Sequence, residues 1–412
     1  MPPGAAQHRG QLPHAVVVGL DGMNGLQTAR ILAARGVPVI GLARNPKDPS
    51  CRTRVCERIQ SVDTQSEALI DALEALAPTL PHKAVLFPCY DMGVLLLSRH
   101  RKRIEALFHH RLPNPETVEL AMDKVRFYRF AREHGIPIPT THFVGSRDEA
   151  QRVAREISFP CVLKPPFSAD PRWEKLSLKA YKLDDADSLL RLYDRASPLA
   201  DTLIVQEWVP GPDSELYSCN AYFDEKSQPL VTHVARKLRQ WPPETGMSSL
   251  GVECRDDRVV EETLRLFRAM AHRGLGYAEL KREPASGRYF LMEPNVGRPT
   301  GRSAIAEAGG VELLYTMYCD AIGAPLPEAR VQRYTGVKWV HLRRDFQSAL
   351  HYRRRGDLTL GDWLRSLRGP KTFALGSLRD PLPFLADLAA SLPELLRKQR
   401  PDPRDLSRAP GP

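Results

Sequence analysis

Two acidic residues inside an apolar hairpin constrain this chain more than any other feature of its sequence. The stretch Tyr277–Thr300 contains two strand-like runs on either side of a Pro/Gly break at residues 283–287. A break of this kind between two apolar runs predicts a β-hairpin. If the turn centres near Ser286, Glu279 lies directly opposite Glu293.

This pairing of like charges predicts a cation site. Acidic residues that face each other in a sheet destabilise it unless something neutralises them. Because side chains alternate along a strand, Asn295 lies on the same face as Glu293. Three oxygen donors without sulfur or imidazole suit a hard cation, so we predict that Glu279, Glu293 and Asn295 bind Mg²⁺. The alternative is a solvated hairpin face on which Lys281 and Arg282 neutralise the acids.

The loop after the hairpin favours an anionic ligand. Arg298 and Arg302 follow the acidic positions closely, and Gly297 and Gly301 let a backbone approach a ligand. Guanidinium groups beside a metal are typical of sites that bind phosphate and carboxylate groups.

The composition narrows the classes of protein that the chain can belong to. The chain has 412 residues and a net charge of +10, but its Lys and Arg residues are spread over the whole length. Without basic residues interleaved with aromatic ones, we expect an anionic substrate and no nucleic-acid partner. The seven cysteines lack metal-ligand spacing and predict reduced thiols.

The sequence gives no sign of a membrane segment. Its longest apolar runs are far shorter than the roughly 20 residues that a membrane span needs. The N-terminal residues 1–13 lack the apolar stretch of a signal peptide, so we expect a short disordered leader and a cytoplasmic protein.

The first hundred residues predict a parallel sheet. Ala15–Leu20 and Val37–Leu42 read as buried strands on either side of a helix, and further strands alternate with helices up to residue 113. The turn after the first strand has glycines at 19, 22 and 25 in a GxxGxxG spacing, which differs from the dinucleotide motif GxGxxG. Arg44 nevertheless leaves NADP binding as an alternative for this region.

Beyond residue 113 the pattern changes to longer helices and antiparallel strands. We expect one helix over 116–133, a lysine inside the apolar strand 160–166, and a strand that ends at Gln206 and Glu207. A second sheet is expected from about residue 214. Arg236 and Lys237 are expected to open a long basic loop that reaches Gly251. The last 80 or so residues are rich in Arg and are interrupted by Pro.

The order and spacing of these residues resemble the ATP-grasp superfamily, and more narrowly its carboxylate-amine ligases of the D-aspartate ligase kind. The resemblance covers about residues 15–325, and the paired-acid hairpin ending in ExN is its most specific part. The implied fold is α/β: a Rossmann-like parallel-sheet (pre-ATP-grasp) domain precedes a two-lobed α+β ATP-grasp fold with antiparallel sheets.

The pattern along the chain and the resemblance together predict domain bounds. The Rossmann-like domain is expected at about 14–113 and the ATP-grasp domain at about 114–325, with a small lobe at about 136–209 and a large lobe at about 210–325. A helical C-terminal extension is expected at about 326–397, followed by a disordered tail at about 398–412.

The resemblance assigns roles by position to three groups of residues. The nucleotide-binding group has Lys124 and Lys164 on the phosphates, Gln206, Glu207 and Val209 at the adenine edge, and Glu215 on the ribose. The metal ligands are Glu279, Glu293 and Asn295. The catalytic group has Arg298 on the acceptor or acyl-phosphate, and Arg236 and Lys237 on the γ-phosphate or substrate carboxylate. Competing interpretations are a helix surface for Lys124, an exposed strand for Glu215, and a solvated loop for Arg236 and Lys237.

The implied function is an ATP-grasp ligase that forms C–N bonds between small-molecule carboxylate and amine substrates. ATP and Mg²⁺ are the implied cofactors, Mn²⁺ is an alternative metal, and a homodimer is a possible assembly.

Two other functions compete with this one. The segment 167–175, where the family has a Gly-rich lid, contains no glycine, which suits a catalytically weak regulatory or scaffold protein. An NADP-dependent oxidoreductase would use Gly19, Gly22, Gly25 and Arg44.

Overall fold

The computed structural model describes residues 12–167 and 181–396, which fall into two compact units. The first unit contains the chain up to Ala121 together with Gly211–Ala386, and the second contains Met122–Pro210 and the chain from Asp387 onward. Most of the expected leader, the expected tail and most of the glycine-free segment 167–175 lie outside the described residues.

The first unit begins with a four-stranded sheet in which every pair of neighbouring strands is parallel. Its order is β3 (Arg58–Ser61), β2 (Val39–Ala43), β1 (Ala15–Val18) and β4 (Val85–Pro88). Its helices are α1 (Met23–Ala34), α2 (Ala68–Leu76), α3 (Asp91–Arg99) and α4 (Arg101–Leu107). The predicted Rossmann-like parallel sheet is therefore confirmed.

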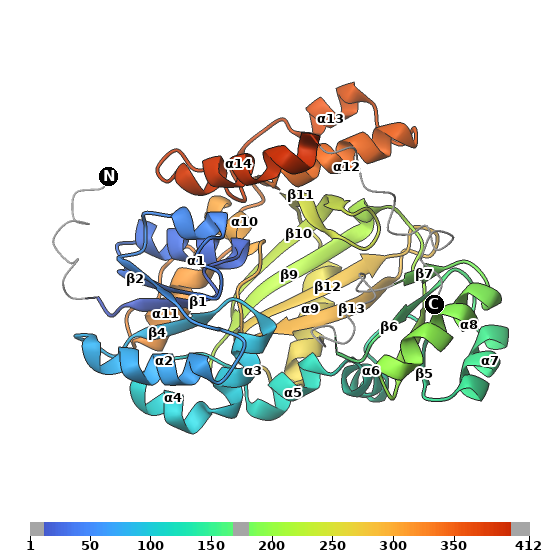
Figure 1. The fold of residues 1–412 in the computed structure, drawn as a ribbon, viewed down its shortest axis with the longest axis horizontal. Helices are drawn as coiled ribbons and strands as arrows, with labels where there is room; N and C mark the ends of the chain where they lie inside the picture. The colour runs from blue at the N-terminus through green and yellow to red at the C-terminus, as the bar shows by residue number, and fades with distance from the viewer. Residues whose placement is uncertain (1–11, 168–180, 397–412) are drawn as a thin grey trace. The chain divides into compact units, whose positions relative to one another are not determined.

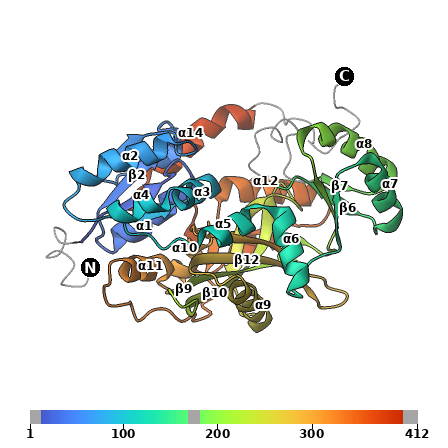
Figure 2. The same ribbon diagram turned by 90° about the horizontal axis from the view of Figure 1, so that it is seen from below.

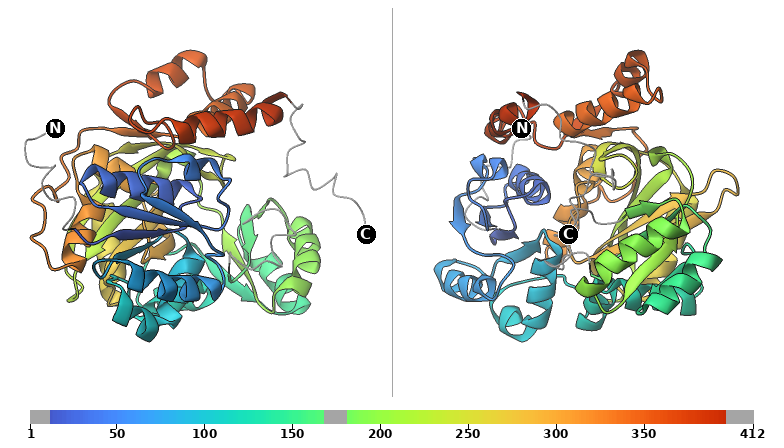
Figure 3. Two further views of the ribbon diagram at one scale, coloured as in Figure 1. Left: turned by 60° about the vertical axis from the view of Figure 1, so that its left-hand side comes forward. Right: turned by 45° about the vertical axis from the view of Figure 1, so that its right-hand side comes forward.

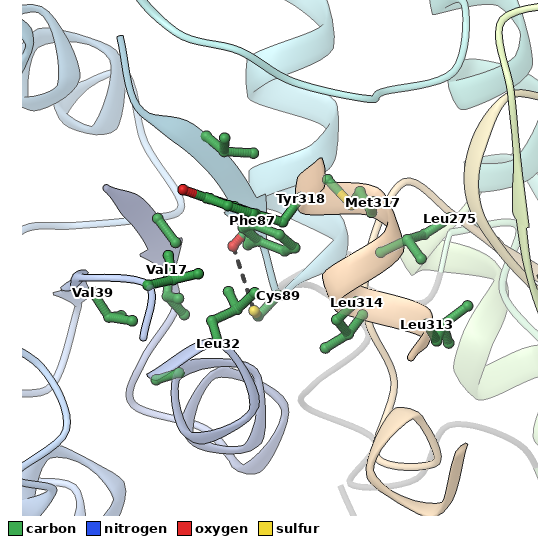
Figure 4. Packing of buried hydrophobic residues seen from close by; sticks show 14 of the residues in the cluster. Val17, Leu32, Val39, Phe87, Cys89, Leu275, Leu313, Leu314, Met317 and Tyr318 are labelled. Atoms are coloured by element: carbon green, nitrogen blue, oxygen red, sulfur yellow. Dashed lines mark hydrogen bonds between the residues drawn. The ribbon is translucent and has the colours of Figure 1, made fainter. Parts of the chain in front are cut away.

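A buried apolar cluster joins this sheet to a helix from much later in the chain (Figure 4). Val17 and Phe87 from the strands and Leu32 from α1 pack with Leu314 and Tyr318 from α11 (Leu313–Ala321). The burial of these apolar side chains is the main contribution to the stability of the core. The shared core explains why residues that precede the second unit in the sequence and residues that follow Pro210 belong to one compact unit.

The first unit also contains a seven-stranded sheet, in which only the last pair of strands is parallel (Figure 1). Its order is β13 (Tyr289–Val296), β12 (Gly274–Arg282), β9 (Leu216–Phe223), β10 (Pro229–Trp241), β11 (Met247–Glu253), β14 (Lys338–Val340) and β15 (Lys371–Phe373). Helix α9 (Asp257–Ala269) packs against β9, β10 and β12, as Figure 2 shows. The antiparallel part of the predicted fold is thus confirmed.

The register of the β12–β13 hairpin places the acidic residues as predicted. Glu279 pairs with Glu293, and Tyr277 pairs with Asn295. A β-bulge between Glu279 and Leu280 shifts the pairing on the turn side of the acids. The prediction of facing carboxylates is confirmed, although the bulge moves the centre of the turn by half a residue.

The expected basic loop from Arg236 to Gly251 is wrong. Arg236 and Lys237 lie within β10, and most of the remaining residues lie in β10 and β11. β10 pairs with β9 from Pro229 to Arg236 and with β11 from Ala235 to Trp241, so the polar half of the strand is held by its pairing with β11. A polar sequence can therefore form a strand here.

The second unit has a four-stranded antiparallel sheet. Its order is β5 (Thr141–Val144), β8 (Leu203–Glu207), β6 (Cys161–Lys164) and β7 (Tyr181–Leu183). Helices α7 (Arg147–Glu156) and α8 (Ala186–Ala196) lie side by side and share a core with the sheet (Figure 3).

The single helix expected over residues 116–133 is in fact two helices, α5 (Pro115–Met122) and α6 (Lys124–Glu133). Asp123 separates them because its carboxylate accepts hydrogen bonds from the backbone N–H groups of Val125 and Arg126, at 2.9 and 3.1 Å. An N-cap of this kind starts a new helix. Lys124 is consequently the first residue of α6.

The C-terminal part of the chain adds both helices and strands to the first unit. The helices after the hairpin, besides α11, are α10 (Ser303–Ala308), α12 (Leu342–Arg354), α13 (Leu360–Ser366) and α14 (Leu382–Leu396). Of these, α14 belongs to the first unit only up to Ala386. The expected helical extension also supplies β14 and β15 to the large sheet. Among the described residues, no helix is both long and apolar enough to cross a membrane.

Two helical glycines test the packing of the first unit. A Cβ at Gly25, the third residue of α1, would lie 2.2 Å from the Gly19 carbonyl oxygen. A Cβ at Gly93, the third residue of α3, would meet nothing closer than 3.6 Å. We expect Gly25→Ala to lower the free energy of unfolding by about 1–3 kcal/mol. Gly93→Ala should raise it by roughly 0.5 kcal/mol. Urea unfolding measures both, and equal effects would contradict this packing.

Candidate functional site

Glu279 lies in β12 with both carboxylate oxygens engaged. Oε1 accepts a hydrogen bond from Lys237 Nζ at 3.1 Å, and Oε2 accepts one from the Tyr277 hydroxyl at 2.7 Å. The Arg302 guanidinium lies 3.6 Å from Oε2, and its Nη1 donates to the Tyr277 hydroxyl at 2.5 Å. The Glu279 side chain is only 15% exposed, so this carboxylate depends on its cationic neighbours.

These neighbours keep Glu279 ionised. Burial raises the pKa of this carboxyl, but the charges of Lys237 and Arg302 outweigh burial and bring the pKa down to about 2. At neutral pH the side chain is therefore an anion, which is the form that binds a cation.

The other two predicted metal ligands lie on the neighbouring strand. Glu293 is exposed and directly opposite Glu279. Asn295 accepts a hydrogen bond at Oδ1 from Arg298 Nη2, and Arg298 Nε donates to a carboxylate oxygen of Asp91. The structure thus brings together Glu279, Glu293 and Asn295 on the β12–β13 hairpin and adds Arg298 beside them.

The donor set fits a hard cation. It offers two carboxylates and one amide oxygen, which are the ligands that Mg²⁺ prefers. Each of these oxygens has two lone pairs, so the hydrogen bonds to Glu279 and Asn295 leave capacity for a metal. No group of three or more His, Cys, Asp or Glu side chains that could hold a metal exists in the described part of the chain. The predicted set, with its single amide, is not such a group.

Of the two basic residues of β10 that were predicted to act, Arg236 and Lys237, only Lys237 reaches this cluster in the described structure. Lys237 is buried and contacts Glu279, whereas Arg236 occupies the adjacent position, so its side chain leaves the opposite face of the strand. Glu215 ends the short 3₁₀ turn before β9, and its Oε2 lies 3.6 Å from Arg282. Neither Arg236 nor Glu215 has a direct hydrogen bond to the three predicted metal ligands in the described structure.

In the second unit, Lys164 and Gln206 meet across neighbouring strands. Lys164 Nζ donates to the Gln206 Oε1 atom at 2.7 Å and to the Tyr128 hydroxyl at 2.6 Å. Gln206 Nε2 donates in turn to the Thr141 hydroxyl at 2.7 Å. The ammonium also lies 4.8 Å from the centre of the Tyr128 ring, where a cation–π interaction stabilises it. These contacts hold a buried lysine in one place.

The remaining predicted nucleotide residues lie at element ends of the same unit. Lys124 donates its backbone N–H to the Pro166 carbonyl at 2.9 Å, which attaches the start of α6 to the end of β6. Glu207 ends β8 and is half-buried, and Val209 is buried two residues later. Lys124 and Glu207 therefore lie at the ends of a helix and a strand, and Val209 lies just beyond the strand.

Sequence reasoning missed three side chains that support the site. Tyr277 lies two positions before Glu279 on the same face of β12, and Tyr128 lies one helical turn after Lys124, so strand and helix periodicity could have found both. Gln240, which contacts Lys237, follows two register shifts in β10 that the sequence does not reveal.

The ionisation of Glu279 predicts a change in acid stability. The pKa of Glu279 is about 2 in the folded protein, against an ordinary value of 4.5 that applies in the unfolded chain. Its ionised form therefore stabilises the fold fully above pH 4.5. This stabilisation is lost as the pH falls through about 2. Glu279→Gln should flatten the pH dependence of the urea midpoint between pH 4.5 and 2. It should also lower the free energy of unfolding at neutral pH by roughly 3–5 kcal/mol, because two buried cations lose their partner.

The control for this measurement is Glu283→Gln, in the turn of the same hairpin, which should keep the acid profile of the natural protein. Parallel profiles for the natural protein and Glu279→Gln would contradict the ion pairing of Glu279. Measurements in EDTA exclude a contribution from bound metal.

Comparison with curated proteins finds ligases at low identity. The chain is 28% identical over 239 residues to D-aspartate ligase from Enterococcus faecium (strain Aus0004), which covers 54% of each chain. It is 23% identical over 219 residues to D-alanine–D-alanine ligase from Ectopseudomonas mendocina (strain ymp), which covers 50% of this chain and 67% of the relative. The chain thus spans about half the length of D-aspartate ligase. No protein-family model matches it.

Comparison with solved structures shows the fold. The ADP complex of N5-carboxyaminoimidazole ribonucleotide synthetase has a TM-score of 0.60 at 14% identity and covers 78% of this chain and 80% of its own. L-amino acid ligase from Bacillus licheniformis has a TM-score of 0.59 at 14% identity and covers 79% and 78%. Together with the hairpin register and the two kinds of sheet, these likenesses show that the chain has an ATP-grasp fold, and its sequence is similar to those of carboxylate-amine ligases.

Proposed function

We propose that this protein is an ATP- and Mg²⁺-dependent carboxylate-amine ligase that forms an amide or peptide bond through an acyl-phosphate. The observation that carries the proposal is the hairpin on which ionised Glu279 faces Glu293, with Asn295 on the same strand face. Lys237, Arg302 and Arg298 supply positive charge beside these oxygens. The names of the similar ligases support the same reaction class.

The chemistry requires activation because a carboxylate has no good leaving group. In the proposed reaction, a carboxylate oxygen attacks the γ-phosphorus of ATP, and ADP leaves as the acyl-phosphate forms. The amine nitrogen then attacks the carbonyl carbon, the bond from that carbon to the phosphate oxygen breaks, and the nitrogen loses a proton. Phosphate and an amide are the products. The protein contributes positioning and charge neutralisation rather than a nucleophile.

Residues of the first unit have roles in binding metal and substrate. Glu279, Glu293 and Asn295 would hold Mg²⁺, which when bound screens the phosphate charges; Mn²⁺ suits the same oxygen donors. Arg298, already beside Asn295, would bind the acceptor or the acyl-phosphate. Lys237 would neutralise the γ-phosphate or the substrate carboxylate. The role proposed for Arg236 is the same as that of Lys237, although β10 directs the Arg236 side chain to the other face of the sheet.

Residues of the second unit have roles in binding the nucleotide. Lys124 and Lys164 would contact the phosphates, and Gln206, Glu207 and Val209 would contact the adenine edge. The buried hydrogen bonds of Lys164 to Tyr128 and Gln206 support this because they fix the ammonium. Glu215 of the first unit would accept hydrogen bonds from the ribose. The similar structures include complexes with ADP and with MgADP.

The substrates that we propose are small molecules: one carboxylic acid and one amine, at least one of them of the amino-acid class. The relatives named D-aspartate ligase, D-alanine–D-alanine ligase and L-amino acid ligase support this class. A homodimer stays a prediction. The regulatory alternative, which depends on the glycine-free segment 167–175, also stays a prediction, since residues 168–180 lie outside the described structure.

An NADP-dependent oxidoreductase is not favoured by the glycine turn after β1. A Cβ at Gly19 would lie 2.3 Å from the Tyr90 ring, and one at Gly22 would lie 2.1 Å from its hydroxyl. The Tyr90 side chain therefore covers the turn that a pyrophosphate would need to approach. Arg44, the expected partner of a 2′-phosphate, lies 3.1 Å from Asp63 and also contacts Gln65.

The metal assignment is tested by neutralising the exposed acid. We expect Glu293→Gln to lower amine-dependent ADP release at least about tenfold, because one anionic ligand of the metal is lost. Raising the Mg²⁺ concentration should restore part of the rate. Glu283→Gln, in the turn of the same hairpin, serves as the control and should retain the natural rate. Full activity of Glu293→Gln at limiting Mg²⁺ would contradict its assignment as a ligand.

The nucleotide assignment is tested in the second unit. Lys164→Met keeps the length of the side chain but removes the charge, and we expect the dissociation constant for ATP to rise about tenfold or more. Lys182→Met removes a lysine of the neighbouring strand β7 and serves as the control, with less than about a threefold change. Titration calorimetry measures both. Equal affinities for the two variants would contradict the role of Lys164.

A further inference from the structure

A series of hydrogen bonds within the first unit connects helix α12 to Glu279. The Tyr352 hydroxyl donates to Asp213 Oδ2. Gln240 Nε2 donates to Asp213 Oδ1 at 2.7 Å, and the Gln240 Oε1 atom accepts from Lys237 Nζ at 3.1 Å. The same Lys237 ammonium donates to Glu279 Oε1 at 3.1 Å. Five side chains from four separate elements are thereby joined.

The middle of this series is shielded from water. Asp213 is 6% exposed, Gln240 is 1% exposed and Lys237 is 6% exposed. A buried polar group destabilises a protein unless it is hydrogen-bonded, and a buried charge does so more strongly. These three side chains therefore depend on one another, and the loss of one leaves its neighbours poorly satisfied.

The chemistry of the two ends fixes the orientation of the Gln240 amide. The Asp213 carboxylate only accepts hydrogen bonds, whereas the Lys237 ammonium only donates them. Gln240 satisfies both neighbours in one orientation alone, with its NH₂ group toward Asp213 and its oxygen toward Lys237. If Asp213 no longer held the NH₂ group, the amide could turn it toward the ammonium, where it would repel Lys237.

Tyr352 and its helix are in turn fixed to the strand that carries Lys237. Helix α12 packs against β10 and β11, beside which it lies in Figure 1. Asp345 of α12 makes a buried ion pair with Arg239 of β10 at 2.9 Å. Ser348 donates its hydroxyl to the Gln240 carbonyl at 2.9 Å. A shift of α12 would therefore move β10, because the helix contacts both a side chain and a backbone carbonyl of this strand.

We propose that Tyr352 and Asp213 are positioning residues that act through Gln240 to hold the Lys237 ammonium against Glu279. This gives helix α12 a part in the site, although it carries none of the proposed ligands. The catalytic consequence rests on the proposed function, whereas the positioning itself rests on the hydrogen bonds. Loss of the positioning should affect turnover more than nucleotide affinity, because the proposed role of Lys237 is confined to the reacting γ-phosphate or the substrate carboxylate, whereas other residues are proposed to hold the adenine, the ribose and the remaining phosphates.

The first experiment compares two tyrosine variants by steady-state kinetics. Tyr352→Phe removes one hydroxyl that donates to an aspartate. Tyr222→Phe is the matched control, because Tyr222 donates to Asp320 and has no bond to this series. We expect Tyr352→Phe to lower kcat about tenfold while KM for ATP changes less than about twofold, and Tyr222→Phe to leave both unchanged. Equal kcat values for the two variants would overturn the proposal.

The second experiment needs no activity and tests the coupling directly. Urea midpoints are measured for Tyr352→Phe, for Lys237→Met and for the double variant. We expect non-additive shifts, since Tyr352 has less to support once the ammonium is gone. The matched cycle of Tyr222→Phe with Lys237→Met should be additive. Additive shifts in both cycles would overturn the positioning of Lys237 by Tyr352.

The two experiments separate this proposal from the proposed function. If the natural protein releases no ADP with any acid and amine pair, the ligase function fails, and the urea cycles alone decide whether Tyr352 positions Lys237. If the natural protein is active and both cycles are additive, the ligase function stands and the positioning is rejected.

Discussion

The ion pair between Lys237 and Glu279 is the interaction on which the rest of the candidate site depends. Removing a carboxylate from water is costly, and the cost is offset only when nearby charges and hydrogen bonds replace the lost solvation. Here Lys237 holds one oxygen, Tyr277 holds the other, and Arg302 adds charge. The low pKa of Glu279 shows that these partners outweigh burial.

This pair requires strands that are far apart in the sequence. Lys237 comes from β10 and Glu279 from β12, and β9 lies between them in the sheet. Arg302 approaches from the residue before α10, and α11 just beyond it shares a core with the N-terminal sheet. The apolar core in Figure 4 thus fixes the segment that follows the hairpin, and the hairpin presents the oxygen donors. Packing, electrostatics and the proposed metal chemistry are connected through this one segment.

Local patterns in the sequence were sufficient for the parallel sheet and for the hairpin register. Buried strands such as Ala15–Val18 are continuous apolar runs, and the Pro/Gly turn after Glu283 determines which acids face each other. Whereas the run Leu230–Val234 in the first half of β10 reads as a strand, the second half was missed because Arg236, Lys237, Arg239 and Gln240 conceal its period. The partners that make the last three acceptable inside a sheet are Glu279, Asp345 and Asp213, which lie far away in the chain. No local pattern reveals such partners, so the support of the site became visible only in the structure.

Binding of ATP together with Mg²⁺ is the property on which the proposed function depends, and heat-monitored unfolding is its direct test. A ligand at about 100 times its dissociation constant stabilises a protein by roughly 2.7 kcal/mol, which raises the melting temperature by a few degrees. We expect such a rise with ATP and Mg²⁺ together, and its loss when EDTA is added. A rise with NADPH and none with ATP and Mg²⁺ would show that the ATP-dependent function is wrong.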